Sequence, residues 1–458
     1  MIYSSLLFIY GFLPVSAAVY CITPNRHREK SLFALSVIFC AMLSMYCLLF
    51  MLMYTLLNYT SALLSEKYRG KKLERIPFFS GAVLDILLIL IFRAEVFTDL
   101  RERFNILSAF YPFGISFMTL SAIGYLADVN KGRIRAEKSF MKLGLFFIFF
   151  PKLLMGPVMH YKKFRILINS RKVSMENIGA GLSVFVKGLA KKVIFADSLL
   201  MLCNAVDSIA YSELSVVTAW LGAIAYPIAL YCTLSGVSEM GVGTAMCFGI
   251  KMPTSFNYPV LSTRLNYFSM RWFIQVKRWF SSYIIKPLYD ISSGLFYRGV
   301  IYVFVCGMIG YWYRCNINGI FYGFLFAAFA LLERFFRSPK RTDITGTVYT
   351  SLITLILLVI FKGENITGSV SYIYAMFGGN RTLIDTVSIY LLRNYLLVLL
   401  LGLYISTDFF RNMVVRSGIK AVRRIYVLLT PVLSLGLLII CTALISYNGA
   451  SDALMLRL

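Results

Sequence analysis

The chain holds few side chains that exchange protons near neutral pH. Its 458 residues include two histidines, His27 and His160. An imidazole, with an ordinary pKa of about 6.5, is well suited to take a proton from a hydroxyl at neutral pH. We interpret His27, which lies in a basic segment, as a solvated residue. His160 is either a polar residue at the end of a membrane span or a general base, which would have to reach the centre of the fold.

Two further kinds of reactive side chain occur in apolar surroundings. Glu239 is a carboxylate inside an apolar stretch, and ionisable residues in membrane segments are costly and usually functional. Glu239 therefore orients a bound donor or pairs with Arg271, or else it forms a structural pair with a loop lysine. The nine cysteines form no CxxC pair and have no metal-ligand spacing with histidine, so we predict small buried hydrophobic residues and no metal site.

The composition predicts a membrane protein. Hydrophobic residues make up 59% of the chain, charged residues 15%, and the mean hydropathy is +0.74, whereas soluble domains carry about a quarter charged residues. The clearest apolar blocks are Ser31–Leu57, Met141–Phe150, Ser215–Leu234, Val348–Phe361 and Ile425–Ser446. These continuous runs lack the period-two alternation of a membrane barrel. We predict an all-α, polytopic transmembrane helical bundle of about eleven to thirteen spans, each roughly 20 residues long, in a single domain over residues 1–458.

The net charge of +25 comes from 46 Lys and Arg against 21 Asp and Glu. Basic residues gather between the apolar blocks, in Arg26–Lys30, Lys67–Arg75, Lys131–Lys138, Lys162–Lys172, Arg334–Arg341 and Arg411–Arg424. Such segments hold cytoplasmic loops in place and contact anionic lipid head groups, so we expect membrane lipids as partners and no nucleic acid. The first two segments flank one apolar run, so either that run re-enters the membrane or one basic segment faces outward.

One basic segment is also rich in aromatic residues. The spacing of aromatic and basic residues over Arg264–Pro287 predicts an amphipathic helix at the membrane interface.

Several motifs follow one another in the middle of the chain. They are PFGISFMTLSAIGYLADVNKG (Pro112–Gly132), FFPKLLMGPVMHY (Phe149–Tyr161), GLAKKVIFADSL (Gly188–Leu199), SGVSEMGVGTAMCFGIKMPTSFNYPVLS (Ser235–Ser262), WFSSYIIKPL (Trp279–Leu288) and the triplet Met376–Gly378. In this order, over nearly the whole chain, they resemble the membrane-bound O-acyltransferase family. The bacterial branch, which contains the alginate O-acetyltransferases and the D-alanyl transfer protein of teichoic acid synthesis, is the most similar.

The resemblance implies a bowl of tilted helices around a central tunnel in the bacterial cytoplasmic membrane. It implies transfer of an acyl, acetyl-like group from a cytoplasmic thioester, acyl-CoA or an acyl carrier, to a hydroxyl of an envelope polysaccharide. No cofactor is expected to stay bound, and a second membrane or extracellular protein is a candidate partner. A family histidine deep in the tunnel is taken as the general base on the acceptor hydroxyl.

The chain departs from the family at this histidine. The stretch GYWYRCNINGIFYGFLFAAFALLER (Gly310–Arg334) aligns without a gap with the histidine-bearing stretch of the family. The base falls on Phe326, which has no lone pair for a proton, and the first family histidine falls on Tyr313. A third family histidine falls on Phe273, and the acidic residue of the family's RDY triplet falls on Ser282.

The remaining candidates for tunnel or donor-site residues are polar. They are Glu239, Arg271, Asn318, Tyr322, His160 and Tyr313. The two phenols can donate hydrogen bonds but, with an ordinary pKa of about 10, are poor bases. Asp128 and Asp197 match acidic positions near span ends, where capping or an ion pair explains them better than catalysis.

Three readings of the function stay open. The chain is an acyltransferase with altered chemistry, or a catalytically silent relative that serves as a membrane scaffold or a partner in glycan assembly. The third reading is a transporter that uses the tunnel. Whether the chain is an enzyme is therefore undecided by its sequence, since a shared fold does not establish a shared function.

Overall fold

The computed structural model describes residues 3–71, 73–94, 97, 114–292, 294–336, 344–407 and 420–448. Pro112 of the first motif, Lys72, and parts of the basic segments Arg334–Arg341 and Arg411–Arg424 lie outside these residues. The regular elements of the described residues are helices. Eight of them are long and apolar enough to cross a membrane: Met45–Lys67, Ile76–Arg93, Val216–Cys247, Leu295–Arg314, Ile317–Arg334, Ile344–Lys362, Thr386–Ile405 and Leu429–Tyr447. The predicted all-α polytopic class is confirmed, while the span count of the whole chain and the central tunnel stay predictions.

The chain divides into two compact units. Unit 1 comprises Met1–Phe185, Val237–Thr254 and Ser281–Tyr283, and unit 2 comprises Val186–Gly236, Ser255–Phe280 and Ile284–Leu458. Neither unit is a continuous stretch of chain, because the polypeptide passes between the two several times. The prediction of one domain over residues 1–458 stays a prediction.

Unit 1 is built mainly from N-terminal helices. They are η1 (Leu7–Phe12), α1 (Leu13–Ile22), α2 (Arg28–Leu43), α3 (Met45–Lys67), α4 (Ile76–Arg93), α7 (Ile115–Asn130), α8 (Phe140–Ile148), α9 (Phe150–Leu153), α10 (Tyr161–Asn169) and most of α11 (Met175–Ala190). Aromatic rings form much of its core: Phe8, Phe12, Phe39 and Phe150 are all buried and contact one another at centroid distances of 5.3–5.8 Å. Aromatic pairs of this kind stabilise a core beyond their buried area.

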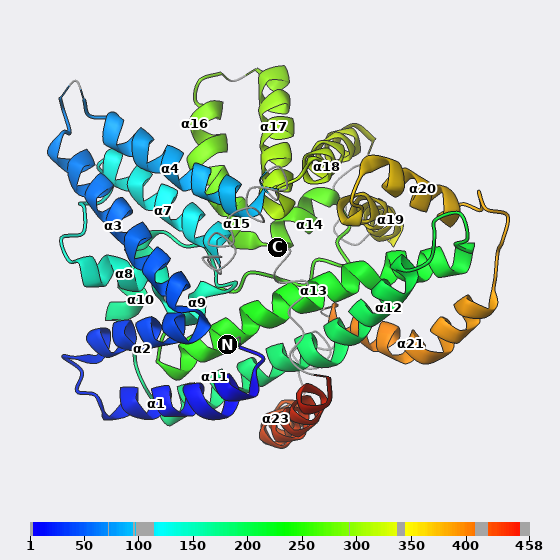
Figure 1. Cartoon of the computed structure of the whole chain (residues 1–458), viewed down its shortest axis with the longest axis horizontal. Helices are drawn as coiled ribbons and strands as arrows, with labels where there is room; N and C mark the ends of the chain where they lie inside the picture. The colour runs from blue at the N-terminus through cyan, green and yellow to red at the C-terminus, as the bar shows by residue number, and fades with distance from the viewer. Residues whose placement is uncertain are drawn as a thin grey trace. The chain divides into compact units, whose positions relative to one another are not determined.

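The apolar run Ser31–Leu57 is two helices. Helix α2 ends at Leu43, Ser44 is extended with φ −168° and ψ 137°, and α3 begins at Met45. The two helices pack against each other, and α3 turns back from the end of α2 (Figure 1). This break supports the first of the two alternatives for the run, in which the chain returns toward the side from which it came.

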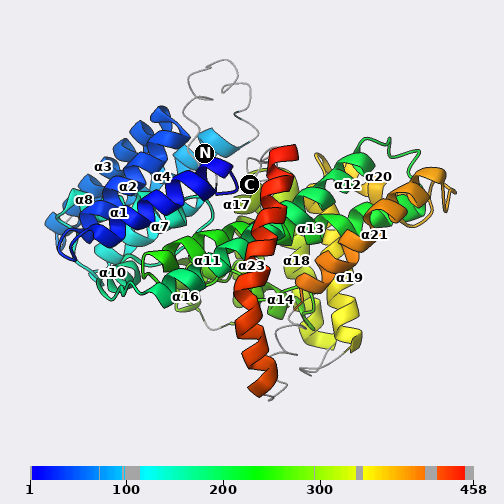
Figure 2. The same cartoon turned by 90° about the horizontal axis from the view of Figure 1, so that it is seen from below.

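Unit 2 holds most of the long apolar helices. They are η3 (Lys191–Ala196), α12 (Asp197–Asp207), α13 (Val216–Cys247, shared with unit 1), α14 (Leu265–Arg271), α15 (Ile274–Phe280), η4 (Ser281–Ile285, also shared), α16 (Lys286–Tyr289), α17 (Leu295–Arg314), α18 (Ile317–Phe336), α19 (Ile344–Lys362), α20 (Ile366–Met376), α21 (Thr386–Ile405) and α23 (Lys420–Asn448). Helices α12 and α13 lie side by side in both views (Figures 1 and 2). Helix α23 packs against η3.

The predicted amphipathic helix over Arg264–Pro287 is wrong in its continuity. The segment forms the short helices α14 and α15, the π-helical turn η4 and the start of α16. Phe273, between α14 and α15, has a φ of 40°, in the left-handed region that a non-glycine residue seldom adopts. A straight amphipathic helix cannot pass through such a residue, so the segment folds back on itself instead.

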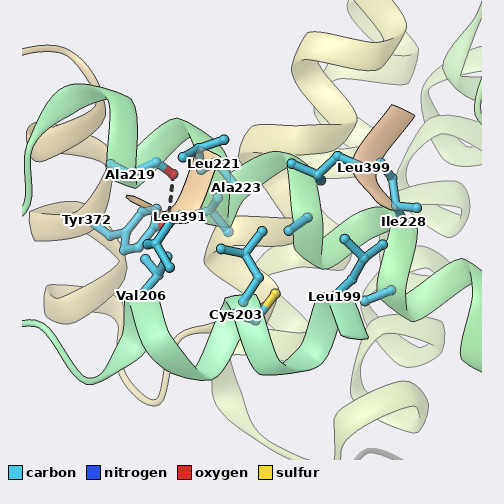
Figure 3. Packing of buried hydrophobic residues seen from close by; sticks show 14 of the residues in the cluster. Leu199, Cys203, Val206, Ala219, Leu221, Ala223, Ile228, Tyr372, Leu391 and Leu399 are labelled. Atoms are coloured by element: carbon cyan, nitrogen blue, oxygen red, sulfur yellow. Dashed lines mark hydrogen bonds between the residues drawn. The ribbon is translucent and has the colours of Figure 1, made fainter. Parts of the chain in front are cut away.

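A buried apolar cluster joins α12, α13, α20 and α21 (Figure 3). Leu199 and Cys203 of α12 face Ala223 and Ile228 of α13, and Leu399 of α21 covers them. Within the cluster, the hydroxyl of Tyr372 on α20 donates to the carbonyl oxygen of Ala219 at 2.8 Å. This packing fixes α13, whose continuation carries the wall of a cavity in the same unit.

Glycines bring α17 and α18 together. A Cβ on Gly310 would collide with the carbonyl oxygen of Gly319, and a Cβ on Gly323 would collide with the carbonyl oxygen of Cys306. Small residues at a helix crossing let two backbones approach closely, as is common among membrane helices. The resulting close pair forms one side of the cavity described next.

Candidate functional site

A cavity of about 80 Å³ lies inside unit 2 among α14, α15, α17 and α18. Its walls are mostly apolar or aromatic, from Phe268, Ser269, Trp272, Lys277, Ile285, Tyr302, Val305, Cys306, Ile309, Gly310, Tyr313, Tyr322, Gly323 and Phe326. A second cavity of about 20 Å³ shares Phe268, Trp272, Tyr313 and Tyr322 with it and extends toward α13 and α19. Ligand sites commonly have this character, with apolar walls and a few well-placed polar groups.

The three positions at which the resemblance implies histidines lie around these two cavities. Phe326 lines the larger one, Phe273 the smaller, and Tyr313 lines both. The rings of Phe273 and Tyr313 are 5.7 Å apart, and the ring of Tyr322 is 6.2 Å from that of Phe326. Phe326 is buried and presents a hydrocarbon ring where the resemblance implies a base.

Lys277 is the one cationic side chain among the residues that line the larger cavity. Its Nζ donates to Oδ1 of Asn266 at 3.2 Å and to Oγ of Ser269 at 2.5 Å, both on or beside α14. Both partners are neutral. Burial lowers the pKa of Lys277 to about 8, because the protonated form loses its hydration.

Lys277 was not among the candidates drawn from the sequence. In a segment read as amphipathic, it counted as one of several interfacial cations. The turn at Phe273 places α15 beside α14. Together with the walls supplied by α17, this leaves the side chain of Lys277 half-buried. The apolar neighbours Val276, Trp279 and Phe280, all buried, are the local signal that could have indicated a partly buried amine.

Two polar residues of α18 hold the walls of the cavity in place. Oε2 of Glu333 accepts a hydrogen bond from the backbone N–H of Leu265 at 3.0 Å, which anchors the first residue of α14. At the other end of α18, Nδ2 of Asn318 donates to the carbonyl oxygens of Ile360 and Gly363 at 3.3 and 2.7 Å. Asn318, a candidate site residue, is buried and ties α18 to the end of α19; it does not line either cavity.

Arg271 and Glu239 lie apart from the cavity walls. Arg271 ends α14, and its Nη1 donates to the carbonyl oxygen of Tyr258 at 3.4 Å. Glu239 is a half-buried residue on the part of α13 that belongs to unit 1. Neither is a lining residue of the two cavities, and a role of Glu239 in orienting a donor stays a prediction.

His160 belongs to a polar cluster in unit 1. Its Nδ1 lies 2.6 Å from the hydroxyl of Tyr283, which donates to Oδ2 of Asp128 at 2.8 Å. Arg133 forms an ion pair with the same carboxylate at 3.2 Å. Burial opposes ionisation of Asp128, but hydrogen bonds from His160 and Tyr283 outweigh it and lower the pKa of this carboxyl.

Two acidic residues near helix ends form ion pairs, one of the two structural roles predicted for them. Asp128 pairs with Arg133, and Asp197 at the start of α12 pairs with Lys192. Among the described residues, no group of three or more His, Cys, Asp or Glu side chains could hold a metal ion.

Comparisons with known proteins agree with the resemblance of the motifs. No protein-family model matches the chain. It is 29% identical over 403 residues to a "Probable alginate O-acetylase" of Azotobacter vinelandii, which covers 84% of this chain and 80% of the relative. It is 26% identical over 430 residues to a "Peptidoglycan O-acetyltransferase" of Helicobacter pylori, covering 83% and 80%. It is 22% identical over 381 residues to a "Teichoic acid D-alanyltransferase" of Bacillus subtilis, and the match covers 78% of this chain and 94% of the relative.

These similarities confirm the predicted resemblance to the membrane-bound O-acyltransferases, since the relatives named here are bacterial proteins of that kind. Together with its eight candidate spans, they make it an integral, multi-pass membrane protein.

Proposed function

We propose that this chain is an O-acyltransferase of the bacterial cytoplasmic membrane with altered catalytic chemistry. It moves an acyl, acetyl-like group from a cytoplasmic thioester, acyl-CoA or an acyl carrier, to a hydroxyl of an envelope polysaccharide. A second membrane or extracellular protein is a candidate partner in delivering the acceptor. The relatives named above, which act on alginate, peptidoglycan and teichoic acid by their names, support this reaction class.

One observation carries the proposal. The positions of the three family histidines, Phe273, Tyr313 and Phe326, line two cavities of unit 2 that share wall residues, although none of the three is a histidine. A decayed site would be expected to fill with side chains, since protein interiors are close-packed. Here a cavity of about 80 Å³ is kept, a space in which a small acyl group fits.

A second candidate function is supported by the same three residues. Two phenylalanines and a tyrosine supply no base at neutral pH, and a positioned general base contributes about 10²–10⁴ to a rate. This favours a catalytically silent relative that serves as a membrane scaffold or a partner in glycan assembly.

The experiment measures transfer of labelled acetyl from acetyl-CoA into envelope glycans of membranes that contain the chain. Empty-vector membranes serve as the control, and the variant Phe326→His is measured beside the native chain. Label from the native chain above the control supports an acyltransferase with altered chemistry. Label from Phe326→His alone supports the silent relative, because a working donor site then lacks only its base. Absence of label from both contradicts acetyl transfer by this chain.

A further inference from the structure

The amine of Lys277 is the one strongly basic group on the walls of the larger cavity. Its side chain extends from α15 to α14, where the oxygens of Asn266 and Ser269 hold Nζ. Phe326 lines the same cavity from α18. The same cavity is therefore lined by Phe326, which cannot accept a proton, and by Lys277, whose nitrogen can.

The surroundings of Lys277 are neutral. The other titratable groups that line the cavity are Tyr302, Cys306 and Tyr313 of α17 and Tyr322 of α18. Charged side chains on the elements around the cavity are Arg278 on its own helix, Arg271 at the end of α14, Glu333, which binds the start of α14, and Arg334 of α18, whose charge acts on Tyr302. No carboxylate lines the cavity among the described residues, so none balances a charge on Nζ there.

The hydrogen bonds of Nζ fit an amine that acts as a base. A neutral amine has two N–H bonds and one lone pair. The two acceptors present, Asn266 Oδ1 and Ser269 Oγ, satisfy both N–H bonds and leave the lone pair for a proton. With a pKa of about 8, roughly one amine in ten is neutral at neutral pH, whereas an ordinary lysine is neutral in only about one in a few thousand.

We propose that Lys277 replaces the missing imidazole as the general base of acyl transfer in this cavity; this rests on the proposed function. The Nζ lone pair accepts the proton of the acceptor hydroxyl while the hydroxyl oxygen forms a bond to the thioester carbonyl carbon. The C–S bond of the thioester then breaks, and the ammonium of Lys277 returns the proton to the departing thiolate. The products are the ester and the free thiol, and Lys277 is again neutral.

The test compares acetyl transfer by three variants with that of the native chain. Lys277→Met removes the nitrogen, and Lys277→Arg keeps a positive charge that cannot be given up at these pH values. Lys163→Met, at an exposed lysine of α10 in unit 1, is the matched control. We expect both Lys277 variants to lose about 10²–10⁴-fold in kcat, the control to keep the native rate, and the native rate to rise with pH toward a plateau above about pH 8.

The outcomes separate the two proposals. If the native chain and the Lys277→Arg variant transfer acetyl equally well, the role of Lys277 as a base is overturned, because a fixed charge then suffices. The proposed function is not overturned by that result. A native chain without transfer overturns the proposed function, and the role of Lys277 with it.

A second measurement does not depend on turnover. Acetic anhydride acetylates neutral amines, and mass spectrometry reports its reaction with Lys277 and Lys163 as a function of pH in the intact, detergent-solubilised chain. We expect half-maximal reaction of Lys277 near pH 8, well below the value of about 10.4 of an ordinary lysine amine. Half-maximal reaction at that ordinary value overturns the proposal, as does a Lys277 that is unreactive at every pH, since the amine would then be out of reach of an acyl group.

Discussion

At the scale of single residues, Tyr283 connects two side chains that lie far apart in sequence. Its hydroxyl donates to Asp128 at 2.8 Å and lies 2.6 Å from Nδ1 of His160. His160 is therefore held by partners in unit 1, which agrees with its interpretation as a positioned polar residue. Its alternative role, as a base, stays a prediction.

The cluster predicts a cost for removing the Tyr283 hydroxyl. Tyr283→Phe deletes a hydrogen bond to a largely buried carboxylate, a bond type that contributes about 1.5–3 kcal/mol. We expect a lower apparent unfolding temperature in detergent, followed by tryptophan fluorescence. Tyr447→Phe, at a tyrosine that is 89% exposed, is the control and should leave the temperature unchanged. Equal temperatures for the two variants would show that the Asp128–Tyr283 contact adds no stability.

At the scale of helices, the α17–α18 crossing depends on glycine. Gly323→Ala places a methyl group against the Cys306 carbonyl and the Gly307 backbone, so the helices must separate. Overpacking of this kind costs about 1–3 kcal/mol, and since Gly323 also lines the cavity, acetyl transfer should fall as well. The control is Gly299→Ala on α17, where an added Cβ would have nothing within 4 Å. This variant should keep or raise the unfolding temperature, because alanine favours a helix by about 1 kcal/mol over glycine. If Gly299→Ala lowered the unfolding temperature as much as Gly323→Ala does, the close α17–α18 crossing would not be the cause of the lost stability.

The same scale shows which features the sequence could predict. Apolar blocks and ordered motifs predicted an all-α membrane fold and the alignment of Phe273, Tyr313 and Phe326 with histidines. They could not predict the break at Ser44, because serine is tolerated within an apolar helix and only the packing of α2 on α3 requires the turn. Lys277 was missed for a related reason: its two hydrogen-bond partners lie 11 and 8 residues away, on the far side of a turn at a residue with positive φ.

At the scale of the whole molecule, the break at Ser44 bears on how the chain crosses the membrane. Basic segments are retained on the cytoplasmic side of membrane proteins. A single crossing between Arg26–Lys30 and Lys67–Arg75 would place one of these segments outside. A return of the chain at Ser44, with α3 packed on α2, places both on the same side and satisfies the charge rule for each.

Cysteine labelling tests this arrangement. Asn25→Cys and Lys71→Cys, each introduced into a Cys21→Ala background because Cys21 is exposed, are treated with a membrane-impermeant maleimide. We expect both cysteines to react in inverted vesicles and neither to react in intact spheroplasts, since both segments face the cytoplasm; detergent-permeabilised cells, in which both must react, are the control. Reaction of one cysteine in spheroplasts and of the other in inverted vesicles would mean that α2 and α3 together make a single crossing. The first basic segment would then have to lie on the opposite face from the second, against the charge rule and despite the turn at Ser44.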